Sequence, residues 1–223
     1  LGVLRALSNT ETEDPEILAL FEQAILDLRR LGAIVVDPVE IKDFAKQRAA
    51  NDFCSAFLWD VNKYFQSLGP KAPVVSFMQI IRSGQYHPSS KWGIDWVNST
   101  KIPPEQQNPP CLGFEEDPRR AAFLAAALAT MDEQKIDAII YPTWNNPPRK
   151  VGDLDSPHGN NSSVISPHTG QPSITVPMGF TTGNLPAGLQ LLGRPFEEAK
   201  LFQYAYAYEQ ATHHRKPPEL FAE

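Results

Sequence analysis

The sequence has few cysteines, no long apolar run and no excess of positive charge. Cys54 and Cys111 are the only cysteines among 223 residues, so a disulfide framework and a four-cysteine zinc site are excluded. The longest uncharged apolar stretch, residues 121–131, is too short to cross a bilayer. A formal net charge of −6, with no basic run, argues against nucleic acid as a partner. We therefore expect a soluble globular chain that binds neither nucleic acid nor membrane.

Motifs for metal and nucleotide binding are also missing. His158 and His168 lie far apart in sequence, and the adjacent His213 and His214 point to different sides of a helix, so neither pair has the spacing of metal ligands on one face. The sequence contains neither a Gly-x-Gly-x-x-Gly nor a Walker motif, and it has no Gly-x-Ser-x-Gly elbow. We expect no metal and no cofactor.

The first forty residues have the pattern of a βαβ unit. Leu1–Arg5 is predicted to be a strand, and Asp14-Pro15 supplies an N-cap followed by proline in the first helical turn. Apolar residues then recur at helical spacing from Ile17 to Leu28, and residues 33–36 are apolar throughout. This order predicts two parallel strands joined by a helix over residues 1–40.

The rest of the chain divides into a helical excursion and an alternating final part. Residues 41–135 are expected to hold a helix over 41–65, a helix that starts at Ser76 and ends at Gly84, an irregular surface segment over 85–117 and a helix over 119–134. Residues 136–223 are expected to form a strand over 136–141, a polar loop over 144–171, a hairpin of 173–177 with 185–193, and a helix over 197–213. The predicted class is α/β, with a mixed sheet covered by helices.

The loop over residues 144–171 is the best place to look for a binding site. It leaves the end of a predicted strand, which is where open α/β sheets bind ligands. Its side chains are mainly neutral hydrogen-bonding groups, and Asp153 and Asp155 are its carboxylates. Such a lining suits a neutral polar ligand such as an amide, and a solvated surface loop is an equally good reading of these residues alone.

Several segments resemble the amidase signature family. They are residues 1–5, 136–143, 169–180, 185–198 and 206–212, and they occur in the order that the family shows. Gln171 stands where the family usually has leucine, and Asn184 replaces a glycine. The matches cover both ends of the chain, whereas residues 40–120 match only in outline.

The resemblance implies the C-terminal half of an amidase-signature α/β/α domain. Residues 1–223 would then be the C-terminal part of a single amidase domain, truncated or cleaved at Leu1. Family members use a Ser–cis-Ser–Lys triad in a glycine- and serine-rich segment that would lie upstream of Leu1. None of its members matches a residue here, so no catalytic residue is assigned to this chain, which alone is expected to be inactive.

The resemblance also implies a function for the whole protein. It would hydrolyse carboxylic amides, that is C–N bonds other than peptide bonds, or related esters. This chain would supply sheet and pocket wall, with the missing N-terminal half and a small-molecule amide as partners. A homo-oligomer is left open. A cytoplasmic location is slightly favoured, although an upstream signal peptide is also left open.

Four residues are predicted to line the substrate pocket: Trp144, Asn145, Asn161 and Pro172. Tyr86 and His87, in the irregular segment, are a weaker candidate for a lid.

Two other functions are weighed against the amidase reading. One is a non-catalytic binding or interaction protein that retains half of an amidase fold. The other is an independent hydrolase that uses Ser162 or Ser163, although these serines lack the neighbouring glycines that would leave amides open to an oxyanion. The fragment hypothesis predicts an apolar face along residues 1–5 and 33–36 that only absent residues would cover.

Overall fold

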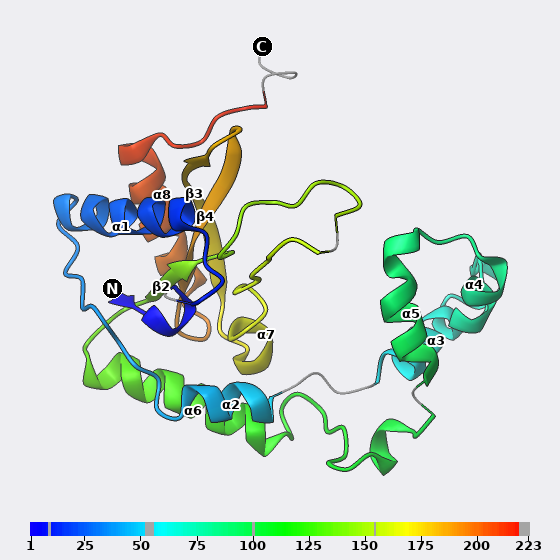
Figure 1. The fold of residues 1–223 in the computed structure, drawn as a ribbon. Helices are drawn as coiled ribbons and strands as arrows, with labels where there is room; N and C mark the ends of the chain where they lie inside the picture. The colour runs from blue at the N-terminus through cyan, green and yellow to red at the C-terminus, as the bar shows by residue number, and fades with distance from the viewer. Residues whose placement is uncertain (9, 52–55, 100, 154, 219–223) are drawn as a thin grey trace. The chain divides into compact units, whose positions relative to one another are not determined.

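A computed structural model describes residues 1–8, 10–51, 56–99, 101–153 and 155–218 (Figure 1). The chain forms two compact units. The first contains residues 1–51 and 118–223, and the second contains residues 52–117. The expectation of a single domain over residues 1–223 stays a prediction. None of the described helices is long and apolar enough to cross a membrane.

The first unit is built on a four-stranded mixed sheet. Its strands are β1 (Gly2–Val3), β2 (Ile139–Pro142), β3 (Ser173–Thr181) and β4 (Leu185–Leu192), in the spatial order β1-β2-β4-β3. β1 runs parallel to β2, whereas β4 runs antiparallel to both β2 and β3. The predicted α/β class with a mixed sheet is confirmed.

Helices lie on both faces of this sheet (Figure 1). α1 (Pro15–Arg30) and α8 (Glu198–Thr212) share a buried apolar cluster with one face, to which Ile140 and Leu191 belong. α6 (Pro118–Glu133) shares a second cluster with the other face, to which Ile139 and Leu192 belong. Neighbouring residues of a strand point to opposite faces, which is why consecutive apolar residues fill two cores. α2 (Phe44–Ala50) and α7 (Ser166–Thr169) contact α6.

The start of α1 follows the prediction from sequence. The Asp14 side chain accepts hydrogen bonds from the backbone N–H groups of Glu16 (2.8 Å) and Ile17 (3.2 Å), which otherwise have no partner in the first helical turn. Pro15 occupies the first helical position, where its missing N–H costs nothing. The capped end of α1 lies beside the β3–β4 hairpin. There the Glu16 carboxylate accepts a hydrogen bond from the Thr182 backbone N–H (2.6 Å).

The strand predicted before α1 is shorter in the structure, and the strand predicted after α1 is not formed. β1 covers Gly2–Val3 only, and Arg5–Leu7 forms a 3₁₀ turn in which Arg5 reaches Asp37 (2.8 Å from Nε). Residues 33–36 form one parallel bridge, between Val36 and Gly2, and no strand. Pro38 has no N–H to donate, and the Val3 carbonyl accepts a bond from the Val39 N–H instead (2.9 Å).

The apolar face predicted along residues 1–5 and 33–36 is present only in part. Ile34 is 84% exposed. Val3 and Leu4, in contrast, are buried to within 1% by other residues of this chain. The exposed apolar surface therefore lies on residues 33–36 and does not extend to Val3 and Leu4.

β4 and the last helices match the prediction closely, whereas β3 continues four residues beyond the predicted end at residue 177. β3 and β4 are joined by the turn over residues 182–184, in which Asn184 adopts a positive φ of 60°. Helices are predicted over residues 119–134 and 197–213, and the ends of α6 and α8 differ from these bounds by one residue. The loop over 144–171, predicted to be without helix, contains α7 and an antiparallel bridge between Trp144 and Asn160.

The second unit contains the helices α3 (Phe57–Ser67), α4 (Phe77–Ser83) and α5 (Lys91–Ser99), with 3₁₀ turns over Gly69–Lys71, Pro88–Ser90 and Pro104–Gln106. Ser76 caps α4 by accepting a bond from the Gln79 N–H (3.3 Å), and Gly84 ends it with a φ of 65°, as predicted. The helix expected over 41–65 is replaced by α2 and α3, and residues 52–55 lie outside the described residues. The segment over 85–117 was expected to be irregular and instead contains α5.

Candidate functional site

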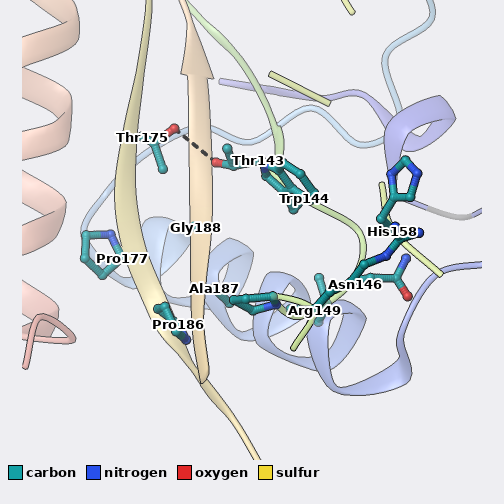
Figure 2. Close-up of a pocket in the computed structure, with 12 residues that line it drawn as sticks. Thr143, Trp144, Asn146, Arg149, His158, Thr175, Pro177, Pro186, Ala187 and Gly188 are labelled. Carbon is teal, nitrogen blue, oxygen red and sulfur yellow. Dashed lines mark hydrogen bonds between the residues drawn. The ribbon is translucent and has the colours of Figure 1, made fainter. Parts of the chain in front are cut away.

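A pocket of about 760 Å³ opens where β2 ends and the long loop begins. One of its walls comes from the β3–β4 hairpin and the other from the loop, as Figure 2 shows. Its lining consists of Ile17, Thr143, Trp144, Asn146, Pro148, Arg149, His158, Thr175, Pro177, Pro186, Ala187 and Gly188. All of these residues belong to the first unit.

The hairpin wall is mostly apolar, and the hydroxyls of two threonines lie beside it. Thr175 and Pro177 come from β3, and their neighbours across the hairpin include Gly188. A Cβ atom at Gly188 would lie 2.6 Å from Thr175 Cγ2 and 2.9 Å from Thr143 Oγ1, so only glycine allows this close approach. The hydroxyls of Thr143 and Thr175 lie 3.1 Å apart and form a hydrogen bond (Figure 2). The Thr175 hydroxyl comes from the hairpin, and the Thr143 hydroxyl comes from the residue that follows β2.

The loop wall carries larger polar side chains. Trp144, Asn146, Arg149 and His158 lie on the side of the pocket opposite Pro177 and Pro186 (Figure 2). The rings of Trp144 and His158 are 6.4 Å apart and tilted by 50°, and Trp144 is 43% exposed. An aromatic face of this size can cover an apolar or planar part of a ligand.

Asn161 holds this loop against the rest of the first unit. Its side-chain Nδ2 donates to the backbone oxygens of Leu7 and Pro142, both at 2.8 Å, and to Oδ1 of Asn145 at 2.6 Å. Its backbone N–H donates to the Thr143 carbonyl (3.0 Å). Because Asn161 is only 5% exposed, these bonds form in a buried environment where leaving them unmade would be costly. The Asn161 side chain thus fixes the end of β2 and the start of the loop.

The four residues predicted to line the pocket fall into two groups. Trp144 lines it. Asn145 and Asn161 are buried behind the wall and bonded to each other, and Pro172 is not among the lining residues, although its carbonyl accepts a bond from the Gly193 N–H (2.9 Å). Contact of these four residues with a substrate stays a prediction. Tyr86 and His87 belong to the second unit, and a lid role for them also stays a prediction.

Several lining residues were not singled out from the sequence as pocket residues. Thr175 and Pro177 are alternate residues of one strand and therefore share a face, a signal that the hairpin prediction already contained. Arg149 offered no such signal, because it lies in an irregular stretch of the loop whose course depends on contacts distant in sequence.

An unusual carboxyl group lies close to the loop wall. The segment over residues 10–14 is bonded to it: the Asp14 N–H donates to the Asn145 carbonyl (2.9 Å), and Asn146 Nδ2 donates to the Thr12 carbonyl (3.0 Å). Within this segment, both carboxyl oxygens of Glu13 are buried and receive no hydrogen bond of standard geometry from the described residues. Burial raises the pKa of Glu13 to about 7, against the opposing effects of the Thr10 backbone and the Arg5 charge.

The described part of the chain offers no activated nucleophile at the two serines weighed from the sequence. The Ser162 hydroxyl donates to Oδ1 of Asn160 (2.5 Å), and the Ser163 hydroxyl donates to the Asn160 carbonyl (3.3 Å). An amide is not a base, so this arrangement does not activate either serine. Among the described residues there is also no group of three or more His, Cys, Asp or Glu side chains that could hold a metal ion.

Comparison with known proteins agrees with the resemblance seen in the sequence. A glutamyl-tRNA(Gln) amidotransferase subunit from Oceanobacillus iheyensis is 42% identical over 93 residues, which make up 39% of this chain and 19% of that protein. The peptide amidase from Stenotrophomonas maltophilia is 27% identical, with a TM-score of 0.65 over 99% of this chain and 44% of its own. An amidase family protein from Bacillus anthracis shares the fold, with a TM-score of 0.70, 22% identity and coverage of 98% and 39%.

The chain therefore spans less than half the length of each of these relatives. The sequence profile of the Amidase family matches residues 1–202, which include both compact units almost entirely. On this match, the chain belongs to the Amidase family.

Proposed function

We propose that this chain supplies sheet and substrate-pocket wall to an enzyme that hydrolyses carboxylic amides, with the nucleophile provided by residues outside the chain. The observation that carries the proposal is the pocket itself. It combines apolar surface with two threonine hydroxyls and an exposed indole, and its lining residues contain no carboxylate. Such a lining can bind a neutral amide, and its two hydroxyls bond to each other rather than to a base that would activate them.

The comparisons support the reaction class. The peptide amidase resembles this chain over nearly its whole length at 27% identity, and its name states that it acts on an amide. This chain matches 44% of that protein, which is consistent with a contribution of pocket wall rather than of a whole active site.

The residues of this chain would act by binding and orientation. The Thr143 and Thr175 hydroxyls can exchange their mutual hydrogen bond for bonds to the polar atoms of an amide, while Trp144 covers its apolar part. The bonds of Asn161 keep the loop wall in place, and a fixed wall holds the substrate in one orientation for attack. The resemblance to the family implies that a serine, activated by lysine through a second serine, attacks the carbonyl carbon.

Substitution of Trp144 tests this role. In the protein that carries these residues, Trp144→Ala should lower kcat/KM for neutral para-nitroanilides about tenfold or more, because the aromatic wall is lost. Trp92→Ala is the matched control, since Trp92 is 80% exposed and lies in the second unit. A wild-type protein that hydrolyses no amide, or equal losses in both variants, would overturn the proposal.

A non-catalytic binding protein is the second candidate. It is favoured by the fact that the two hydroxyls of the pocket wall, those of Thr143 and Thr175, bond to each other and not to an activating base. Binding of an amide to the wild-type protein without turnover, measured by calorimetry and product analysis, would support this candidate instead.

A further inference from the structure

The outward side of α8 has an unusual composition for a surface helix. α8 packs on the sheet through its buried residues Leu201, Ala205 and Tyr208. On the opposite side, exposed residues recur at spacings of three and four, which places them on one face. We call this set the α8 face: Ala199, Phe202, Gln203, Tyr206, Ala207 and Gln210. The structure describes every residue of α8, and none of these six is charged.

The neighbouring helix α1 shows the pattern that is normal for such a position. It shares the buried cluster of α8, and its exposed residues include Glu16, Arg29 and Arg30. The middle of the α8 face instead holds two large aromatic side chains, of which Phe202 is 64% exposed and Tyr206 is 65% exposed. Exposed aromatic residues without charge among them are typical of the centre of a protein–protein contact.

The aromatic pair has small residues beside it. Phe202 and Tyr206 are four residues apart, so their side chains are neighbours on the helix surface. Ala199 and Ala207 belong to the same face and leave room next to the rings. Large side chains next to small ones allow a second helix to pack closely, because the rings of one helix can enter the spaces of the other. The face can therefore receive a helix of its own kind.

The two ends of α8 differ in charge. Glu198 is exposed in the first turn, whereas Arg215 is exposed just after the helix has ended at Thr212. When two such helices run antiparallel, the acidic end of each lies near the basic end of the other, which is favourable. A parallel pair would bring like charges together at both ends. The charges thus make α8 complementary to a second, antiparallel copy of itself.

We propose that the α8 face is the contact between two copies of the protein that carries this chain, packed antiparallel about a two-fold axis. A two-fold contact uses the same patch on both partners, which is why self-complementarity is the property it needs. The contact concerns assembly and is independent of the proposed amide hydrolysis. No residue of α8 lines the described pocket, so this pairing uses a surface separate from that site.

Sedimentation velocity over a series of protein concentrations tests the proposal, and the wild-type protein should form a dimer. Phe202→Lys and Tyr206→Lys should each raise the dissociation constant of the dimer about tenfold or more, because each replaces a central aromatic contact with a charge. Tyr64→Lys is the matched control, since Tyr64 is 59% exposed, lies in α3 and should leave the dissociation constant unchanged.

An exchange of charges tests the antiparallel arrangement. Glu198→Arg and Arg215→Glu should each weaken the dimer, because each places like charges near one another across the contact. The double variant, with both substitutions in one chain, should restore the wild-type dissociation constant. A dimer that is weakened by the lysine variants but not restored by this exchange would contradict the antiparallel arrangement.

Three further results would overturn the proposal. The first is a wild-type protein that stays monomeric at every concentration, and the second is a dimer that neither Phe202→Lys nor Tyr206→Lys weakens. The third is a monomer that Phe202→Lys destabilises in chemical denaturation more than Tyr64→Lys does. That result would show that another segment of the same polypeptide covers the α8 face, since a lysine at a freely exposed position has little effect on stability.

Discussion

At the scale of single residues, two buried polar side chains behind the loop wall differ in how their hydrogen-bonding capacity is used. Asn161 donates to Leu7, Pro142 and Asn145 and so joins the N-terminal segment, the end of β2 and the loop. Glu13, in contrast, keeps both carboxyl oxygens buried without a hydrogen bond of standard geometry from the described residues. Asn161 therefore stabilises the wall at all pH values, whereas the contribution of Glu13 depends on its protonation.

We predict that Glu13 makes stability fall as pH rises. Its pKa is raised in the folded state from its usual 4.5 to about 7, so between these values the folded state holds a proton that the unfolded state has lost. The favourable contribution is complete below about pH 4.5 and is lost as pH rises through 7. Glu13→Gln keeps the side chain neutral and should raise the free energy of unfolding at pH 8 by about 1 kcal/mol, a figure reduced for partial exposure.

Chemical denaturation at a series of pH values measures this effect. Glu11→Gln is the control, because Glu11 is exposed and close by in sequence. An equal shift of stability with pH in the wild type and in Glu13→Gln would contradict the assignment.

At the scale of secondary-structure elements, the pocket depends on how closely β4 passes β3 and the end of β2. Gly188 lies at this crossing, paired with Pro177, and the adjacent Leu189 is paired with Pro142. The Thr143 N–H donates to the Gly188 carbonyl (2.8 Å), which ties the residue between β2 and the loop to the hairpin. The elements that form the two walls are thus joined at one glycine.

Substitution of this glycine should affect the sheet and the pocket together. Gly188→Ala places a Cβ 2.6 Å from Thr175 Cγ2, so the strands must move apart, at a cost of about 1–3 kcal/mol. Gly93→Ala is the matched control, because Gly93 lies in α5 with open space around it, and alanine should stabilise that helix by about 1 kcal/mol. Thermal denaturation should show opposite changes, and an unchanged midpoint for Gly188→Ala would refute this account.

Elements with local signals could be predicted from the sequence, and elements that depend on distant contacts could not. The caps at Asp14 and Ser76 and the turn around Asn184 are set by residues a few positions apart, and all three are present. The predicted strand over residues 33–36 is wrong because apolar composition does not show whether a segment pairs with the sheet. The helix α5 is missing from the prediction because the prolines around it suggested an irregular segment. At the site, Trp144 could be proposed from its place after a strand end, whereas Arg149 required the folded loop.

At the scale of the whole molecule, the chain belongs to the Amidase family but spans less than half the length of the relatives it matches. The Amidase profile matches residues 1–202, yet the peptide amidase is matched over 44% of its chain. The described residues form a mixed sheet, helices on both its faces and a pocket, and the serines near that pocket bond to Asn160 rather than to a base. The central claim is therefore a division of work, in which this chain binds the amide and another segment attacks it.

The measurement that tests this claim most directly is labelling with a fluorophosphonate, which forms a covalent adduct with an activated serine, followed by mass spectrometry of the peptides. We predict a single adduct on a serine outside these 223 residues, with amide hydrolysis lost in step with labelling. An adduct on Ser162, Ser163 or any other serine of this chain would contradict the account.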